Sequence, residues 1–138
     1  MPVPLDIKVI FKEVVVTDDA DPFGSGEFYF IAEVDGQSVG NSETIFDAVE
    51  GETIVLPASE WTSPTIGVRG KPSVKISFKG MDEDVFCDDE LGTVKHTLKP
   101  PWKQGTFKRS TEYFILIYEV VLGVRGSFNH HPPATVFS

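Results

Sequence analysis

The amino-acid sequence predicts an all-β protein, an antiparallel eight-stranded β-sandwich. Three observations lead to this prediction. Apolar and polar side chains alternate along several short segments, which is the period of half-buried strands. Clusters of glycine, proline and aspartate separate these segments, as turns require. The composition, with 11 Phe but only 2 Met, favours β structure because aromatic and β-branched residues pack well in strands. No segment has a convincing helical period.

The first half of the chain contains five of the predicted strands. They are expected at residues 5–16, 28–34, 37–41, 53–56 and 65–69. The first strand has apolar side chains at alternate positions from Leu5 to Phe11, and Asp35-Gly36 is a strong signal for a hairpin turn. Residues 17–27 are rich in aspartate, glycine and proline, and we therefore expect a loop there.

The second half contains the other three predicted strands, at residues 73–79, 92–98 and 112–122. Residues 112–122 are the most apolar, and their β-branched and aromatic side chains favour a central strand, with a buried helix as the alternative. The length of 138 residues fits one domain, which we expect at residues 1–126, followed by a C-terminal tail at 127–138.

Composition and motifs exclude several classes of function. A net charge of −9 argues against nucleic acid as a partner, because phosphate binding usually needs a basic surface. The single cysteine, Cys87, excludes an intramolecular disulfide and a multi-thiolate metal site. Neither nucleophile spacing nor a phosphate-binding glycine loop occurs, so we expect no enzyme activity. The sequence has no secretory signal pattern and no apolar segment of roughly 20 residues, so the expected location is cytoplasmic or peripheral to a membrane.

The most informative segment is an acidic one, with six carboxylates within nine positions from Asp82 to Glu90. These like charges repel one another, and Ca²⁺ prefers about six to eight oxygen ligands supplied largely by carboxylates. A solvated acidic turn is the alternative interpretation. Residues 17–27 form a second acidic loop, and alternate connections of a sandwich share an end. We therefore expect the two loops to meet and to bind calcium.

Both loops carry the spacing of a known family. The first reads Asp21-Pro-Phe-Gly-Ser-Gly-Glu27, and the second reads Asp82-Glu-Asp84-Val-Phe86-Cys-Asp-Asp89-Glu-Leu-Gly92. Over residues 5–122 the chain thereby resembles the C2 domain family, a calcium- and phospholipid-binding β-sandwich. The long apolar strand stands last, as in the permuted topology of part of that family. The second loop is one residue shorter than the commonest form, Glu27 replaces the usual Asp, and residues 36–73 match poorly.

The resemblance implies a set of functional residues. The implied calcium ligands are Asp21, Glu27, Asp82, Asp84 and either Asp88 or Asp89. Phe23 and Phe86 stand at the loop tips, where the family inserts apolar side chains into the bilayer. An alternative role for both phenylalanines is to cap the end of the core.

We therefore expect a calcium-binding module that binds an anionic phospholipid membrane or a protein partner in the presence of calcium. A second hypothesis is a structural or assembly domain, calcium-stabilised or metal-free, that contacts other protein chains. A third is a carbohydrate-binding module, in which exposed Trp61 and Trp102 would supply the stacking faces. A basic region beside Trp102, from Lys99 to Arg109, is expected either to contact lipid headgroups or to form a solubilising loop at the other end.

Overall fold

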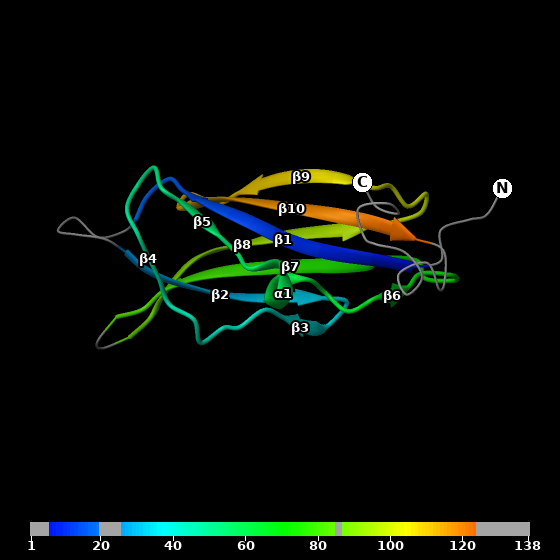
Figure 1. Ribbon diagram of the computed structural model, residues 1–138, viewed down its shortest axis with the longest axis horizontal. Coiled ribbons are helices and arrows are strands. Elements are labelled where there is room, and N and C mark those ends of the chain that lie inside the picture. Colours follow the sequence, from blue (N-terminus) through cyan, green and yellow to red (C-terminus); the bar gives the residue numbers. More distant parts are fainter. Residues whose placement is uncertain (1–5, 20–25, 85–86, 124–138) are drawn as a thin grey trace.

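The computed structural model describes residues 6–19, 26–84 and 87–123. In these parts the chain forms two antiparallel sheets that face each other across a shared core (Figure 1). The predicted all-β antiparallel sandwich is therefore confirmed. No helix within the described ranges is long and apolar enough to cross a membrane.

The first sheet is built around the two most apolar long strands. Its strands are β1 (Asp6–Val16), β5 (Thr53–Val55), β6 (Ile66–Gly67), β9 (Gly105–Ser110) and β10 (Phe114–Gly123). Their order is β5-β1-β10-β9, and β6 also pairs with β1. β1 and β10 pair along almost their whole length, from Asp6 opposite Gly123 to Val16 opposite Phe114. The predicted central strand at 112–122 is confirmed, and the helical alternative is excluded.

The second sheet supplies the strands that lead into the acidic segment. Its strands are β2 (Gly26–Val34), β3 (Gln37–Val39), β4 (Phe46–Ala48), β7 (Val74–Asp82) and β8 (Asp89–Leu98). Their order is β3-β2-β7-β8, with β4 pairing on β2. Asp35 and Gly36, both at positive φ, make the predicted turn between β2 and β3.

Aromatic side chains fill the space between the sheets. The ring centroids of Phe30 and Phe78 lie 5.0 Å apart, and those of Phe11 and Phe78 lie 5.2 Å apart. All three side chains are fully buried, and Phe114 packs on the same group. Because burial of each ring stabilises the fold by about 1.5–3 kcal/mol, this cluster holds the two sheets together.

The structure differs from the prediction in the number of its elements. Among the described residues there are ten strands and one short helix, α1 (Ala58–Trp61), in place of eight strands. The sequence does not predict β4 and β9, because three residues are too few to show a period and β9 is largely exposed and polar. α1 is a single turn without a side-chain cap. The predicted boundary at residue 126 and the tail at 127–138 lie outside the described residues.

Trp61 is the main correction to the side-chain expectations. Its side chain is completely buried and packs edge-on against Phe30, so it cannot offer a face to a sugar. The backbone of Gly40 lies against the ring, and a Cβ atom added there would overlap the ring carbons. Trp102 is only half-buried and packs on the core. The carbohydrate hypothesis thus loses one of its two stacking faces.

Candidate functional site

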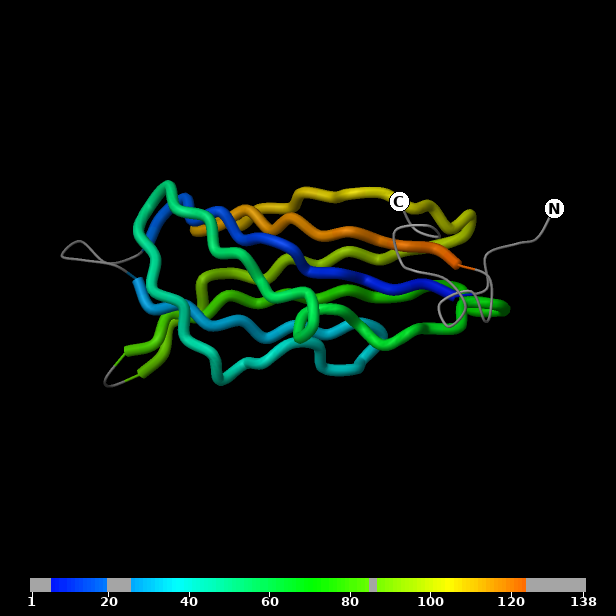
Figure 2. Tube along the Cα trace, viewed as in Figure 1, coloured from blue at the N-terminus to red at the C-terminus, as the bar shows by residue number. Residues whose placement is uncertain are grey.

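The two acidic connections meet at one end of the sandwich. β1 ends there and β2 begins there, as do β7 and β8 respectively, whereas the β8–β9 connection lies at the opposite end (Figures 1 and 2). The Glu83 N–H donates to the Glu27 carbonyl oxygen at 2.8 Å. The Glu27 N–H donates to Asp82 Oδ1 at 3.3 Å. Backbone and carboxylate contacts thus tie the start of β2 to the end of β7.

A third connection, which the sequence did not single out, joins the same end. It is the turn between β4 and β5, where the Gly51 N–H donates to the Val16 carbonyl oxygen at 2.8 Å. The Glu50 N–H donates to Asp19 Oδ2 at 3.2 Å. Asp19 in turn lies so close to Gly26 that a Cβ atom on that glycine would be 2.6 Å from the Asp19 carbonyl oxygen. The turn lies in the region that matched the family pattern poorly, and its Glu-Gly-Glu sequence was the available signal.

Strand alternation divides the predicted ligands between two faces of the second sheet. Phe28, Asp82 and Asp89 stand directly opposite one another on β2, β7 and β8. Residues in this relation point to the same face, and Phe28 is fully buried in the core. Asp82 and Asp89 therefore extend the core-facing side of the sheet at its acidic end. Like charges directly opposite in a sheet destabilise it, by about 0.2–1 kcal/mol.

The outer face carries Glu27 and Asp88. Glu27 precedes the buried Phe28, so its side chain points away from the core, and its neighbour across the strand pair is Asp47. Tyr29 lies on the same outer face, and its hydroxyl donates to Asp88 Oδ2 at 2.5 Å. The Asp84 N–H donates to Asp88 Oδ1 at 3.1 Å. Both carboxylate oxygens of Asp88 thus accept hydrogen bonds from the chain itself.

The hydrogen bond between Tyr29 and Asp88 changes the acidity of both groups. It raises the pKa of Tyr29 to about 12, with smaller contributions from burial and from the charges of Asp88 and Glu83. The same bond, helped by the Asp84 N–H, holds the pKa of Asp88 below its ordinary value. Asp88 therefore stays ionised and anchored to β2. The sequence reasoning missed Tyr29, although its alternate position after Glu27 places it on the outer face.

The structure brings together only part of the predicted ligand set. Asp82 and Asp89 face each other, Asp84 is exposed just beyond β7, and Asp88 is held by Tyr29. Asp21, Phe23 and Phe86 lie outside the described residues. Within the described ranges, no group of three or more Asp, Glu, His or Cys side chains is arranged to hold a metal ion. The donors at this end are all oxygens, which suits a hard cation such as Ca²⁺.

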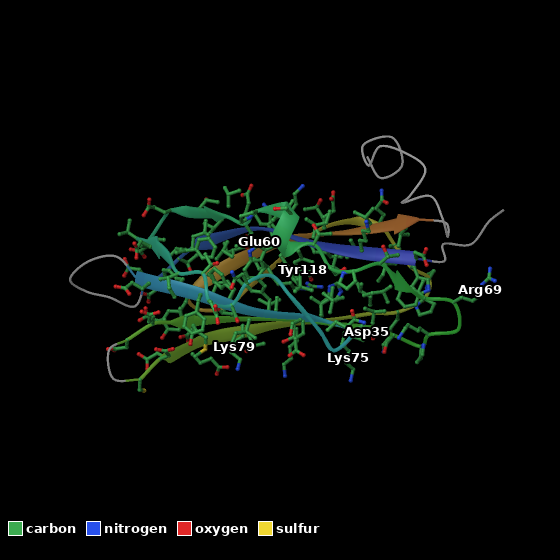
Figure 3. The ribbon with its side chains drawn as sticks, turned by 60° about the horizontal axis from the view of Figure 1, so that its bottom comes forward. Asp35, Glu60, Arg69, Lys75, Lys79 and Tyr118 are labelled. Carbon is green, nitrogen blue, oxygen red and sulfur yellow. The ribbon has the colours of Figure 1, made fainter. Side chains whose placement is uncertain are left out.

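Positive charge near this end lies on the outer face of the second sheet. Lys79 Nζ is 3.9 Å from Glu90 Oε1, and both side chains are exposed, so the ion pair contributes little stability. Figure 3 shows Lys75 and Lys79 on the outer side of β7. The opposed pair Asp82 and Asp89 lies on the other face.

No protein-family model and no curated protein matches this sequence. Similarity to solved structures is clear at the level of the backbone. A structure described as a C2 domain is 16% identical, with 87% of this chain and 99% of that chain covered and a TM-score of 0.54. Human GIVD cytosolic phospholipase A2 is 16% identical, with coverages of 90% and 18% and a TM-score of 0.58. The two calcium-bound C2 domains of extended synaptotagmin 2 are 15% identical, with coverages of 88% and 47% and a TM-score of 0.50.

These similarities concern the fold. The chain spans almost the whole of the first structure but only 18% of the phospholipase, so the match covers a small part of that enzyme. The resemblance drawn from the two loops is confirmed at the level of architecture, and the permuted strand order stays a prediction. This protein is a two-sheet antiparallel β-sandwich with the fold of C2 domains.

Proposed function

We propose that the acidic end of the sandwich binds calcium, and that the calcium-loaded protein docks on an anionic phospholipid membrane or a protein partner. The observation that carries the proposal is the direct opposition of Asp82 and Asp89 at the ends of β7 and β8. A divalent cation between two such carboxylates converts repulsion into attraction, because each carboxylate oxygen becomes a ligand. The calcium-bound state of a structure with this fold supports the same assignment.

The proposed ligands are Asp82, Asp84 and Asp89, with Asp21 contributed by the first loop. Asp88 takes a positioning role, because its two oxygens already accept hydrogen bonds from Tyr29 and from the backbone of Asp84. Glu27 supports the site through its backbone N–H, which donates to Asp82.

Calcium binding would prepare the loops for a negatively charged surface. The protein carries a net charge of −9, and anionic lipid headgroups would repel its acidic end in the absence of a cation. Bound calcium reverses the local field and leaves coordination positions for phosphate oxygens. The predicted tips Phe23 and Phe86 would then supply apolar contact with the bilayer.

Thermal unfolding with and without calcium tests the metal site. Millimolar calcium is expected to raise the melting temperature of the wild type and to leave Asp82→Asn/Asp84→Asn unchanged. The matched control is Glu33→Gln/Glu60→Gln, which removes the same charge from exposed positions away from the acidic end. This control should keep the full calcium response. If calcium does not stabilise the wild type, or if the double Asn variant keeps the response, the calcium site is wrong.

Co-sedimentation with vesicles tests the docking step. Vesicles with anionic phospholipid should bring down the wild type only in the presence of calcium, and neutral vesicles should not. Should calcium bind without any vesicle association, the membrane target is refuted and a protein partner takes its place. A stable oligomer that binds neither calcium nor vesicles would favour the structural or assembly role.

A further inference from the structure

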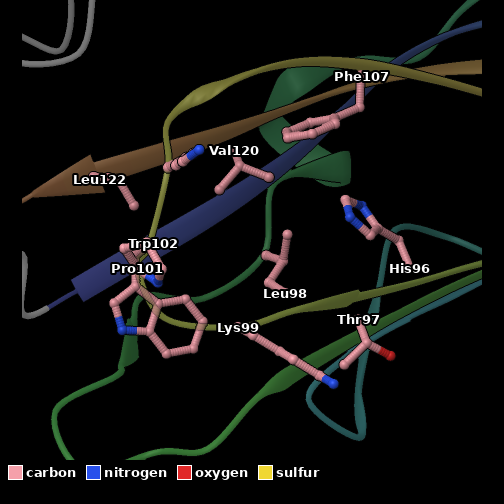
Figure 4. A pocket seen from close by; sticks show the side chains of 10 residues that line it. His96, Thr97, Leu98, Lys99, Pro101, Trp102, Phe107, Val120 and Leu122 are labelled. Atoms are coloured by element: carbon pink, nitrogen blue, oxygen red, sulfur yellow. The ribbon is translucent and has the colours of Figure 1, made fainter.

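A cavity opens at the end of the sandwich opposite the acidic loops. It has a volume of about 180 Å³ and lies between β8 and β9, the edge strands of the two sheets, with β10 as its floor (Figure 4). Its position follows from the topology. The chain leaves one sheet at the end of β8 and enters the other at the start of β9, so the two edges are joined only by the connection around Trp102.

The inner walls of the cavity are apolar and partly aromatic. Leu98 and Val120 are buried in the core, while Trp102, Phe107 and Leu122 pack on it and keep part of their surface open. An apolar cavity of roughly 150 Å³ is large enough to bind benzene. The volume here therefore suits one aromatic ring or a short aliphatic chain, and is too small for a phospholipid.

The rim of the cavity is cationic in a strongly acidic protein. Acidic residues outnumber basic ones by 21 to 12 in the whole chain, yet the lining includes Lys99 and Lys103 and no Asp or Glu. In Figure 4 the Lys99 side chain extends along the rim beside Thr97. An anionic group at this rim would meet two ammonium groups without a competing carboxylate in the lining.

His96 decides where the charge of a ligand would lie. It forms part of the wall, and its Nδ1 is 2.6 Å from the Tyr118 hydroxyl oxygen. Burial, and then the nearby charge of Arg109, lowers the pKa of His96 below its ordinary value of 6.5, so the ring is mostly neutral at pH 7. The positive charge in the lining thus belongs to the lysines at the rim.

We propose that this cavity binds a small organic monocarboxylate whose body is a single aromatic ring or a short aliphatic chain. The body packs between Trp102 and Phe107, and the carboxylate lies at the rim beside Lys99 and Lys103. The site is separate from the proposed calcium site, since the two lie at opposite ends of the sandwich (Figure 1).

Nuclear magnetic resonance of the two tryptophan indoles provides the test. Phenylacetate is the probe, and the chain has only 2 Trp, of which Trp61 is buried in the core. Phenylacetate should shift the indole N–H signal of Trp102 in a saturable manner and leave that of Trp61 in place. Trp102→Phe assigns the two signals. Absence of a saturable shift at tens of millimolar phenylacetate overturns the proposal.

Charge variants then test the anion. Lys99→Gln/Lys103→Gln should weaken phenylacetate binding by about threefold to tenfold, the range expected for two exposed ion pairs. The same variant should bind the neutral analogue phenylacetamide as the wild type does. The matched control is Lys75→Gln/Lys95→Gln, which removes two lysines from the same sheet outside the lining. An equal loss of phenylacetate binding in this control would show a general charge effect and overturn the carboxylate site.

Filling the cavity is the last check. Leu122→Phe places a larger side chain at a half-buried position of the lining, so it should abolish the Trp102 shift while the thermal unfolding stays cooperative. Anionic vesicles provide the competing case. If calcium-free vesicles shift the Trp102 signal and phenylacetate does not, this end contacts a lipid surface and the small-ligand proposal is wrong.

Discussion

Replacing Asp89 by Asn is expected to change the stability of the protein in opposite directions with and without calcium. In a chelator, the substitution removes one of two like charges that stand directly opposite each other on β7 and β8. Relief of such a pair stabilises a sheet by about 0.2–1 kcal/mol. For a domain of this size, about 1 kcal/mol corresponds to roughly 4 °C, so the melting temperature should rise by about 1–4 °C.

With calcium the same substitution should be harmful relative to the wild type. At about 100 times its dissociation constant, a ligand stabilises the folded state by about 2.7 kcal/mol. By the same conversion the wild type gains roughly 10 °C, and Asp89→Asn should lose most of that gain.

Asp88→Asn is the matched partner of this substitution, because it removes the same charge from the neighbouring residue. It weakens the anchor to Tyr29, so in a chelator it should lower the melting temperature, while most of the calcium response should remain. Differential scanning calorimetry in chelator and in calcium measures all four states. The reasoning is refuted if Asp88→Asn abolishes the calcium response, or if Asp89→Asn is destabilising in chelator and keeps the response.

Two further predictions concern the fold and the anchor of the acidic end. Gly40→Ala should destabilise the protein by about 2–5 kcal/mol in urea unfolding, since a Cβ atom would overlap the buried Trp61 ring at a φ of +83°. Gly70→Ala, with a φ of +79° but open space, should cost only about 1–2 kcal/mol, and equal costs would contradict this account. In a separate experiment without calcium, Asp88→Asn should lower the pKa of Tyr29 from about 12 towards 10.0, measured by tyrosinate absorbance. Because the folded-state pKa is raised, the stabilisation by this bond is complete below pH 10.0 and is lost as the pH rises towards 12, and an unchanged Tyr29 titration in the variant would argue against the bond.

Much of the architecture could be predicted from local patterns. The alternation of Val74, Ile76 and Phe78 identifies the core-facing side of β7, and all three side chains are buried. β9 could not be found in this way, because it is an edge strand with mostly exposed polar side chains and only Phe107 packed on the core. Trp61 could not be placed either, since its burial depends on Gly40, a residue distant in sequence that leaves room for the ring.

The acidic end shows where local patterns stop being informative. Charge density alone indicates that residues 82–90 are unusual, but the division of Asp88 and Asp89 between two faces depends on strand register. The pairing of β7 and β8 shifts between Lys79 and Met81, and a shift of one residue moves a side chain to the opposite face. Only the three-dimensional register therefore separates the residue opposite Asp82 from the residue that Tyr29 holds.

The order of the strands also explains where part of the positive charge is found. Each sheet has one margin of three-residue or shorter strands, at β3 to β6, and one long margin, at β8 or β9. Short margins offer little template for pairing with another molecule, whereas long ones are usually guarded by charged side chains. β8 carries Lys95, and β9 carries Lys108 and Arg109, all exposed. Neutralising these three residues would leave the core intact and open two long margins to pairing with a second copy, so their role is to protect the folded protein from aggregation.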